Sequence, residues 1–279
     1  MITIFADTTS SIPPKEASRL GIQYLPQIII FGNDSYRDDT EIDAATFIKK
    51  LQSSSALPKT AAPPPALYVP LYEKYATAGN TVIVLCPSAK VSGTIRSAEV
   101  AAQDFAGSDI RIIDTLSIGA SLAMIVKQAK KWVDEGLDAD TVVVHIQNLI
   151  SREHNIFVVD TLEYLYKGGR IGGAKMLFGS VLQIKPLLSL IKGQTEAVES
   201  QRTKKRAIAR LKEIILTESP HDNDALLCIQ HGSAESEAKE IAEELRNSMG
   251  LTEVPVFELP PAFLVHTGPG VIGACYFVK

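Results

Sequence analysis

The strongest constraint on the fold is a pattern that occurs three times in the first half of the chain. A short apolar run ends in a loop of small, hydroxyl-bearing residues, and helical spacing of apolar residues follows. The loops are residues 7–11, 88–94 and 114–119. Short apolar strands that alternate with helices are typical of parallel sheets buried on both faces. The pattern therefore predicts an α/β fold with a mainly parallel N-terminal sheet and helices on both of its faces.

The strands of this sheet are expected at residues 2–6, 22–31, 81–85 and 110–113. Residues 141–146 (TVVVHI) have high strand propensity, so their assignment needs a second criterion. Val142, Ile146, Leu149 and Ile150 recur at helical spacing, and Asp138 and Asp140 are suited to cap a helix. We therefore predict a helix there.

The second half does not repeat the strand–loop–helix pattern of the first half, and we predict a mixed α/β sheet there. Strands are expected at 156–159, 225–229, 254–259 and 271–278, and a β-hairpin at 184–191 and 194–201, with Lys192-Gly193 as its turn. We expect two domains, an N-terminal α/β domain of residues 1–153 and a C-terminal mixed α/β domain of residues 154–279.

Composition excludes several classes of protein. Hydrophobic residues make up 46%, which is ordinary for a globular protein, and 28 Lys and Arg against 32 Asp and Glu give a net charge of −4. A nucleic-acid-binding protein usually carries a basic surface instead. Because the sequence shows neither a bilayer-spanning apolar run nor a signal peptide, we expect a cytoplasmic protein without an integral membrane segment. The three cysteines stand singly in apolar runs, which predicts buried thiols.

The hydroxyl-rich loops are the first candidates for a binding site. Ligands of open parallel sheets bind at the carboxyl ends of the strands, and a helix N-terminus attracts an anion. Ser92, Gly93 and Thr94 are the best candidates, because the glycine allows close backbone approach and two hydroxyl groups can donate. The alternative is that these Ser and Thr residues only cap helices.

Standard catalytic motifs are incomplete. Neither Ser92 nor Ser117 has the glycine two residues earlier that a hydrolase nucleophile elbow requires. Gly168 and Gly173 have phosphate-loop spacing, but Ala174 stands where lysine is needed. Because the phosphate loop is incomplete, we expect no ATP site. The five histidines lack paired metal spacing, so we expect no metal and no cofactor. A self-contained hydrolase that uses Ser92 and His266 with Asp7 or Asp114 remains the alternative function.

Two further residues are singled out by their surroundings. His266 precedes Thr-Gly-Pro-Gly, which we interpret as a tight, exposed turn between the two closing strands. Such a histidine can donate a hydrogen bond to a carboxylate, or it can be an ordinary loop residue. Arg170 lies among four glycines, where it is suited to contact an anionic partner or is merely the soluble residue of a tight loop.

Five motifs together resemble the DegV family, the fatty-acid-binding proteins that serve bacterial fatty acid kinase. The resemblance extends over essentially the whole chain, and the five motifs occur in order. They are residues 6–9 (ADTT), 88–94 (SAKVSGT) with Ser97-Ala98, 114–119 (DTLSIG), 162–171 (LEYLYKGGRI) continuing to Ile184-Lys185-Pro186, and 266–270 (HTGPG).

The resemblance implies a two-domain protein that holds one long-chain fatty acid, such as palmitate, in a buried tunnel at the domain interface. It implies that Ser92, the Gly93 amide, Thr60 and His266 bind the carboxylate. Arg202 and Arg170 correspond to family arginines that contact the carboxylate network or the kinase. It also implies that this chain is not itself an enzyme, because a separate ATP-dependent subunit would phosphorylate the acid. We expect a monomer that binds no nucleic acid.

The chain departs from the family pattern at one loop. The family often reads Thr-Ser-Gln-Pro-Ser where this chain has Thr60-Ala61-Ala62-Pro63-Pro64. The threonine is kept, but three polar side chains are lost. We therefore expect fewer hydrogen bonds around the carboxylate and an altered ligand preference.

Overall fold

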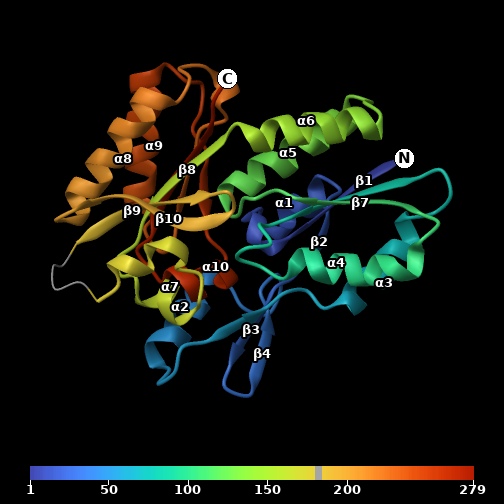
Figure 1. The fold of residues 1–279 in the computed structure, drawn as a ribbon, viewed down its shortest axis with the longest axis horizontal. Helices are drawn as coiled ribbons and strands as arrows, with labels where there is room; N and C mark the ends of the chain where they lie inside the picture. The colour runs from blue at the N-terminus through green and yellow to red at the C-terminus, as the bar shows by residue number, and fades with distance from the viewer. Residues whose placement is uncertain (180–183) are drawn as a thin grey trace.

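The computed structural model describes residues 1–179 and 184–279, and its N-terminal sheet confirms the predicted parallel arrangement (Figure 1). The strand order is β2–β1–β6–β7, and every neighbouring pair is parallel. The strands are β1 (Ile2–Asp7), β2 (Gln23–Leu25), β6 (Thr81–Cys86) and β7 (Asp109–Asp114). Their carboxyl ends therefore lie along one edge of the sheet, as the sequence predicts for its three loops.

Helices cover both faces of this sheet because its strands are apolar on both sides. Ile4 and Ala6 of β1 join the core formed with α5 (Ala120–Asp134) and α6 (Ala139–Ser151). Phe5, which points the other way, packs with α3 (Pro65–Tyr75) and α4 (Thr94–Ala102). The helix expected at 141–150 is confirmed as α6, and the Asp138 side chain accepts hydrogen bonds from the first amide groups of that helix.

The second sheet is mixed, as predicted, with the order β10–β9–β8–β13–β11–β12. Its one parallel pair is β11–β12, and its other neighbouring pairs are antiparallel. The expected hairpin is confirmed, and both Lys192 and Gly193 in its turn have positive φ. The strands are β8 (Glu153–Val158), β9 (Lys185–Ile191), β10 (Gln194–Gln201), β11 (Cys228–His231), β12 (Val256–Glu258) and β13 (Ile272–Phe277).

The two faces of the second sheet have different neighbours. Helices α8 (Lys204–Glu218) and α9 (Glu235–Met249) cover one face. On the other face, Cys228, Cys275 and Phe277 join the core of α5, so that α5 lies between the two sheets (Figure 1). The rest of this face packs with α2 (Ala44–Ser53), α7 (Glu163–Lys167) and α10 (Pro261–Thr267).

The single strand expected at 22–31 is wrong. The chain leaves the parallel sheet after Leu25, and β3 (Ile28–Phe31) pairs instead with β4 (Asp34–Arg37) and β5 (Lys59–Ala61) in a separate three-stranded sheet. Pro26 has no N–H to donate to a strand ladder. The Gln27 N–H points away from the sheet to Thr8 Oγ1 and Asp38 Oδ1, at 2.9 Å each.

The exposed turn expected at His266 is also wrong. His266 lies on the last turn of α10 and is partly buried. Pro261 begins this helix, and Ala262, Phe263 and Leu264 are all buried. A short helix that is apolar on every side has no amphipathic pattern, so no periodicity in the sequence marks it.

The remaining elements are short. They are α1 (Pro14–Arg19) and the 3₁₀ helices η1 (Thr8–Ser10), η2 (Gln103–Phe105), η3 (Gly172–Leu177) and η4 (Asn223–Ala225). The prediction of buried thiols is confirmed for all three cysteines, and the Sγ atoms of Cys228 and Cys275 lie 2.8 Å apart across β11 and β13. Within residues 1–179 and 184–279, no helix has the length and apolar character that a membrane crossing requires.

Candidate functional site: an anion site beside an apolar cavity

The three hydroxyl-rich loops meet at the carboxyl edge of the parallel sheet. The Ser88 N–H donates to Ser117 O at 2.8 Å, and the Gly119 N–H donates to Thr9 O at the same distance. Each loop therefore contacts a neighbouring loop. This part of the site follows directly from the strand order.

The two long helices that begin at this edge differ in how their first amide groups are satisfied. At α5, the Ala120 N–H donates to Gln230 Oε1 at 2.9 Å, and Gln230 comes from the second sheet. At α4, the Thr94 N–H donates to Ser92 Oγ at 3.3 Å, and the residue before the helix is Gly93, which is exposed and has no side chain to act as a cap. The N-terminus of α4 therefore remains accessible to an anionic group.

A buried carboxylate holds the loop that carries Ser92. Thr94 Oγ1 donates to Asp7 Oδ2 at 2.6 Å and lies 3.0 Å from Ser92 Oγ. Gln27 Nε2 also donates to Asp7 Oδ2, at 2.7 Å. Burial raises the pKa of Asp7, and hydrogen bonds from Thr9, Thr94 and Gln27 oppose that rise. Asp7 thus positions Ser92 through Thr94, and its side chain also caps η1.

His266 and Thr60 are brought together from distant parts of the sequence. Thr60 Oγ1 on β5 lies 3.0 Å from His266 Nε2 on α10, which is hydrogen-bonding distance. Burial, together with the charge of Arg170, lowers the pKa of His266 to about 4. The imidazole is therefore neutral at physiological pH. Among the described residues its Nδ1 atom has no hydrogen-bond partner, and a methyl group on Gly168 would overlap it.

Arg170 is held against the Ser92 loop rather than displayed on a flexible one. Its Nε donates to Val91 O at 3.0 Å, and its Nη1 donates to Gly168 O at 2.7 Å. The side chain is partly buried, and burial lowers its pKa. Arg170 therefore connects the residue before Ser92 to the segment that packs on His266.

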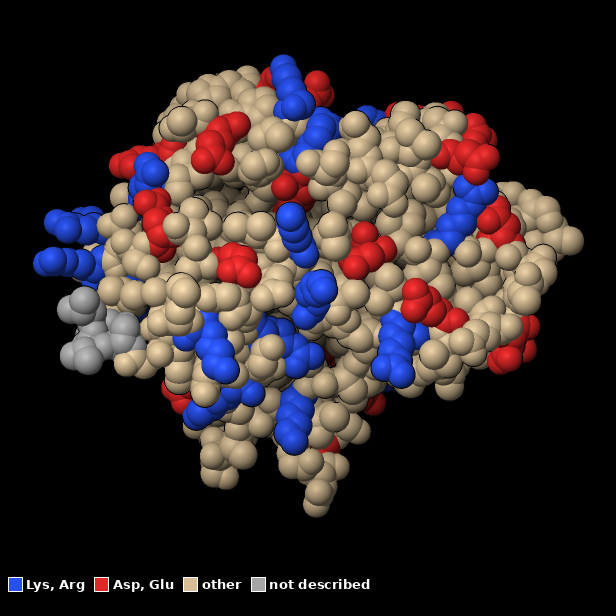
Figure 2. Space-filling view, viewed as in Figure 1, with Lys and Arg blue, Asp and Glu red and all other residues tan. Residues whose placement is uncertain are grey.

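Two cavities meet at Arg170 and His266, which line both. The first is mainly apolar and leaves about 50 Å³ between Val91, Ile118, Phe157, Leu165, Arg170, Leu190, Thr195, Ala262, Phe263, His266 and Thr267. The second has about 290 Å³ and is lined by Leu57, Pro58, Lys59, Thr60, Lys167, Gly168, Arg170, Val265 and His266. Figure 2 shows Lys and Arg side chains gathered where α7, α10 and β3 lie in Figure 1.

The structure brings together most of the residues that the sequence singled out. Thr60, Arg170 and His266 line the second cavity. Gly93 lies beside the Thr60 segment, because a Cβ built on it would be 3.7 Å from Ala62 Cβ. Ser92 and Gly93 line neither cavity, although the adjacent Val91 lines the first. Arg202 also lines neither and is exposed just before α8.

Sequence reasoning did not assign Lys59 or Lys167 to the site, although both line the second cavity and Lys167 also pairs with Glu163. Lys167 lies within the quoted motif at 162–171, and Lys59 lies next to Thr60. Lysine is common on surfaces, so adjacency alone could not assign them to the site.

The contacts count against the hydrolase alternative. Ser92 Oγ interacts with Thr94, whereas His266 Nε2 interacts with Thr60. Asp7 accepts its hydrogen bonds from Thr9, Thr94 and Gln27. A serine nucleophile needs a hydrogen bond to its histidine base and an acid that orients that base. In the described part of the chain these three groups are not linked in that order.

Comparison with known proteins identifies the family. Residues 1–279 match the family model described as "Uncharacterised protein, DegV family". A DegV domain-containing protein of Halalkalibacterium halodurans is 32% identical over 279 residues, which cover 100% of this chain and 99% of that protein.

Solved structures agree with this match over the full length. A DegV family protein from Thermus thermophilus, described by its fatty acid binding, has a TM-score of 0.91 and 31% identity, covering 100% of this chain and 99% of that one. DegV of Bacillus subtilis, described as a fatty acid binding protein, has a TM-score of 0.87 and 26% identity with the same coverage. The chain belongs to the DegV family.

Proposed function

We propose that this protein binds a long-chain fatty acid, with the acyl chain in the apolar cavity and the carboxylate at Thr60 and His266. The observation that carries the proposal is that Arg170 and His266 line both an apolar and a basic cavity. One ligand with an apolar tail and an anionic head fits that junction. The fatty acid binding described for the relatives from Thermus thermophilus and Bacillus subtilis supports the same ligand class.

The acyl chain supplies most of the binding free energy in this proposal. Each buried methylene contributes about 0.8 kcal/mol, so a C16 chain such as palmitate gains on the order of 10 kcal/mol before ordering costs. The apolar cavity has about 50 Å³, roughly the volume of one or two water molecules. Side chains such as Phe157, Leu165 and Phe263 must therefore move apart to admit the chain, and that movement costs part of the gain.

The carboxylate needs partners because a buried, unpaired charge costs several kcal/mol. When the Thr60 hydroxyl donates to His266 Nε2, the N–H of the neutral imidazole is at Nδ1 and can donate to the carboxylate; both groups donate to it only where it replaces their mutual hydrogen bond. The Gly93 amide can add a donor at the start of α4, and Ser92 can add its hydroxyl by exchanging its contact with Thr94 Oγ1 for the carboxylate. Arg170 supplies positive charge. Ala61 and Ala62 stand where relatives often have polar residues, so this site has fewer donors on that side.

We further propose that the protein presents the acid to a separate ATP-dependent kinase subunit, which forms the acyl phosphate. The basic cavity supports this, because Lys59, Lys167 and Arg170 line it together with Thr60 and His266, and positive charges suit a phosphoryl group. In this scheme Arg170 and the exposed Arg202 contribute to the contact with the kinase. The protein itself then performs no catalysis, acts in the cytoplasm as a monomer, and holds its tunnel between the domains at 1–153 and 154–279.

The first test is to denature the purified protein, extract it with organic solvent and identify the extract by mass spectrometry. We expect about one fatty acid per chain, and its identity would define the preferred length and unsaturation. The proposal would be contradicted if the extract contained no fatty acid and a second extraction, after the protein was incubated with C14 to C18 acids, also contained none.

The second test measures acyl phosphate formation with a purified fatty acid kinase subunit. We expect Ser92→Ala and His266→Ala to lower the rate at least tenfold while the fold persists. Ser53→Ala and His221→Ala are matched controls, since both residues are exposed and hydrogen-bond only to nearby backbone. Full activity in both site variants would contradict the assigned site.

A further inference from the structure

Two buried cysteines face each other in the second sheet and line neither of the cavities described above. Cys228 on β11 and Cys275 on β13 are direct partners in the antiparallel register, and both are fully buried. Residues opposite each other in antiparallel strands have Cα atoms about 4.5–5.5 Å apart, which is within the range of disulfides, about 4.4–6.8 Å. The two Sγ atoms lie 2.8 Å apart. The strand pairing therefore places the two thiols where a disulfide can form without movement of the backbone.

A hydroxyl group and a carboxylate lie beside Cys275. Asn155 on β8 is the direct partner of Cys275 on the other side of β13, so Glu153, two residues earlier on β8, points to the same face of the sheet. Burial raises the pKa of Cys275, and a hydrogen bond from Ser121 on α5 opposes that rise. The Ser121 hydroxyl also donates to Glu153 Oε1. Ser121 thus connects the thiol to a carboxylate that can accept its proton.

The ionisation of Glu153 suits that role. Burial raises its pKa to about 7, so that near neutral pH a large fraction of the side chain is a carboxylate and a weak base. A base is most effective when its pKa is close to the working pH. Glu153 is also only partly buried, which lets it exchange protons with water.

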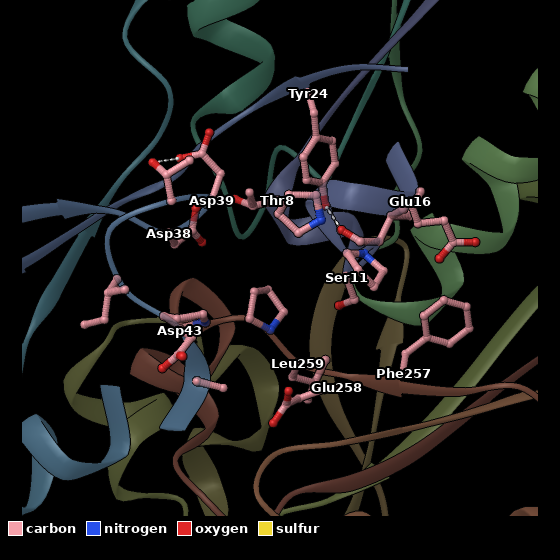
Figure 3. A pocket seen from close by; sticks show the side chains of 18 of the residues that line it. Thr8, Ser11, Glu16, Tyr24, Asp38, Asp39, Asp43, Phe257, Glu258 and Leu259 are labelled. Atoms are coloured by element: carbon pink, nitrogen blue, oxygen red, sulfur yellow. Dashed lines mark hydrogen bonds between the residues drawn. The ribbon is translucent and has the colours of Figure 1, made fainter. Parts of the chain in front are cut away.

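A pocket opens beside the core that contains the two thiols. It has a volume of about 500 Å³, and Phe257 on β12 and Lys127 on α5 are among the residues that line it. Figure 3 shows the Phe257 side chain in the wall of this pocket. Phe257 belongs to the same core cluster as Cys228 and Cys275, and β12 is the neighbour of β11. A small, uncharged oxidant can therefore approach the thiol pair from this pocket when the Phe257 side chain moves aside.

A metal site is the alternative use of two adjacent thiols. Structural zinc sites use four ligands. Within residues 1–179 and 184–279, no group of three or more His, Cys, Asp or Glu is arranged to hold a metal ion. The third cysteine, Cys86, is buried in a different core cluster, with residues of α3 and α4. The pair is therefore better suited to oxidation than to metal binding.

We propose that Cys228 and Cys275 form a redox-sensitive pair, which hydrogen peroxide converts reversibly into a disulfide. Cys275 gives its proton to Glu153 through Ser121, and its sulfur attacks one peroxide oxygen. The O–O bond breaks, Cys275 becomes a sulfenic acid, and the departing hydroxide takes the proton back from Glu153 and leaves as water. The Cys228 sulfur then attacks the sulfenic sulfur, the S–S bond forms, the S–O bond breaks, and a second water leaves. In total, the two thiols lose two electrons and two protons, and one peroxide becomes two waters.

The test treats the purified full-length protein with hydrogen peroxide at pH 7, counts the free thiols after denaturation, and locates the new bond by peptide mass spectrometry. We expect the number of thiols to fall from three to one and the mass to fall by two hydrogen atoms. Dithiothreitol should restore all three thiols. Cys86 should remain a thiol throughout, which shows that the pair reacts in the folded protein.

Variants test the proton path separately from the pair. Cys275→Ser should keep both of its remaining thiols. Ser121→Ala and Glu153→Gln should each slow disulfide formation at least tenfold, because the thiol then loses its route to a base. Ser151→Ala is the matched control and should react at the wild-type rate, since Ser151 is exposed on α6 and donates only to Asn148 O. Circular dichroism establishes that each variant is folded, and if one of the two slowed variants does not fold, the other decides.

Three results would overturn the proposal. The first is that all three thiols persist in peroxide. The second is that Cys86 is oxidised as fast as the pair or appears in the disulfide, because the reaction would then run through the unfolded chain. The third is that Ser121→Ala and Glu153→Gln both form the disulfide at the wild-type rate.

Discussion

At the scale of the residue, the site depends on a histidine that remains neutral beside an arginine. His266 is partly buried, and Arg170 lines the same two cavities. A second positive charge there would be repelled by Arg170 and poorly hydrated. A neutral imidazole can still donate one N–H to a carboxylate, while Arg170 and the lysines of the second cavity provide the charge.

This arrangement predicts how His266 titrates. By NMR with labelled histidine, we expect the His266 imidazole to stay neutral from pH 8 down to pH 5 and to titrate near pH 4, because burial lowers its pKa to about 4. Arg170→Gln should raise that pKa, but not to the usual histidine value, since burial is the larger cause. An imidazolium signal from His266 at pH 6 in the wild-type protein would contradict this account.

The close approach of Gly168 to His266 gives a second prediction at this scale. Gly168→Ala would place a methyl group against His266 Nδ1 and close to Tyr164 O. We expect the histidine to be displaced from Thr60, a loss of stability of about 1–3 kcal/mol, and fatty acid affinity at least tenfold weaker. Titration with a fluorescent fatty acid and urea unfolding measure the two effects.

Gly107→Ala is the matched control for this substitution. A methyl group on Gly107 would have open space around it, and the backbone there has no positive φ. We expect this variant to retain wild-type fatty acid affinity. If Gly168→Ala binds fatty acid as tightly as Gly107→Ala does, the packing of Gly168 on His266 is not needed for binding.

At the scale of the element, the sequence predicted the structures whose periodicity is regular and whose termini are marked. α6 has Asp138 as its cap and apolar residues at helical spacing, and the β9–β10 hairpin has the Lys192-Gly193 turn. α10 could not be predicted in this way, because it is short and buried nearly all round. The third sheet was missed because the break between β2 and β3 depends on tertiary contacts of Gln27 with Thr8 and Asp38.

The junction of α5 and β8 predicts a pH-dependent contribution to stability. Glu153 accepts hydrogen bonds from Ser121 on α5 and from Asn155 on β8, and burial raises its pKa from 4.5 to about 7. Between pH 4.5 and 7 the folded state binds more protons than the unfolded state. The free energy of unfolding therefore falls as pH rises through this range, by roughly 3 kcal/mol at most from this group.

Glu153→Gln should remove this part of the pH dependence. In urea unfolding, we expect the stability of the variant relative to wild type to increase by about 2–3 kcal/mol between pH 5 and pH 8. Glu240→Gln, an exposed substitution on α9, should show a constant difference. Because Asp38 also titrates near neutral pH, the comparison of variant with wild type is what isolates Glu153. If the difference in the free energy of unfolding between Glu153→Gln and wild type were the same at pH 5 and pH 8, Glu153 would not be the source of this pH dependence.

At the scale of the whole molecule, the candidate site is assembled from segments that no local pattern connects. The motifs predicted Ser92, Gly93 and His266 as candidates, and the strand order explains why the three loops meet. The contact between Thr60 and His266 spans 206 residues and depends on how β5 packs with α10. The inward position of Arg170 likewise depends on Val91 in the loop after β6, which a sequence pattern cannot reveal.

The core shared by the two sheets leads to a prediction about folding. Cys228, Phe257, Cys275 and Phe277 of the second half pack in one cluster with α5 and β1 of the first half. Residues 1–153 expressed alone would expose the apolar side of α5 that faces the second sheet. We therefore expect this fragment to bind a hydrophobic dye and to unfold without a cooperative transition, although the predicted domain boundary lies at its end.

The full chain should instead unfold in a single transition. Differential scanning calorimetry of the full protein should give one peak, with equal calorimetric and van't Hoff enthalpies, because neither sheet can keep the α5 core buried without the other. The same scan on Phe277→Ala should shift that single peak to lower temperature, since deletion of a buried phenylalanine side chain typically costs about 3–5 kcal/mol. Two resolved peaks, or a cooperative transition in the isolated fragment, would mean that each half folds on its own core and that α5 merely joins them.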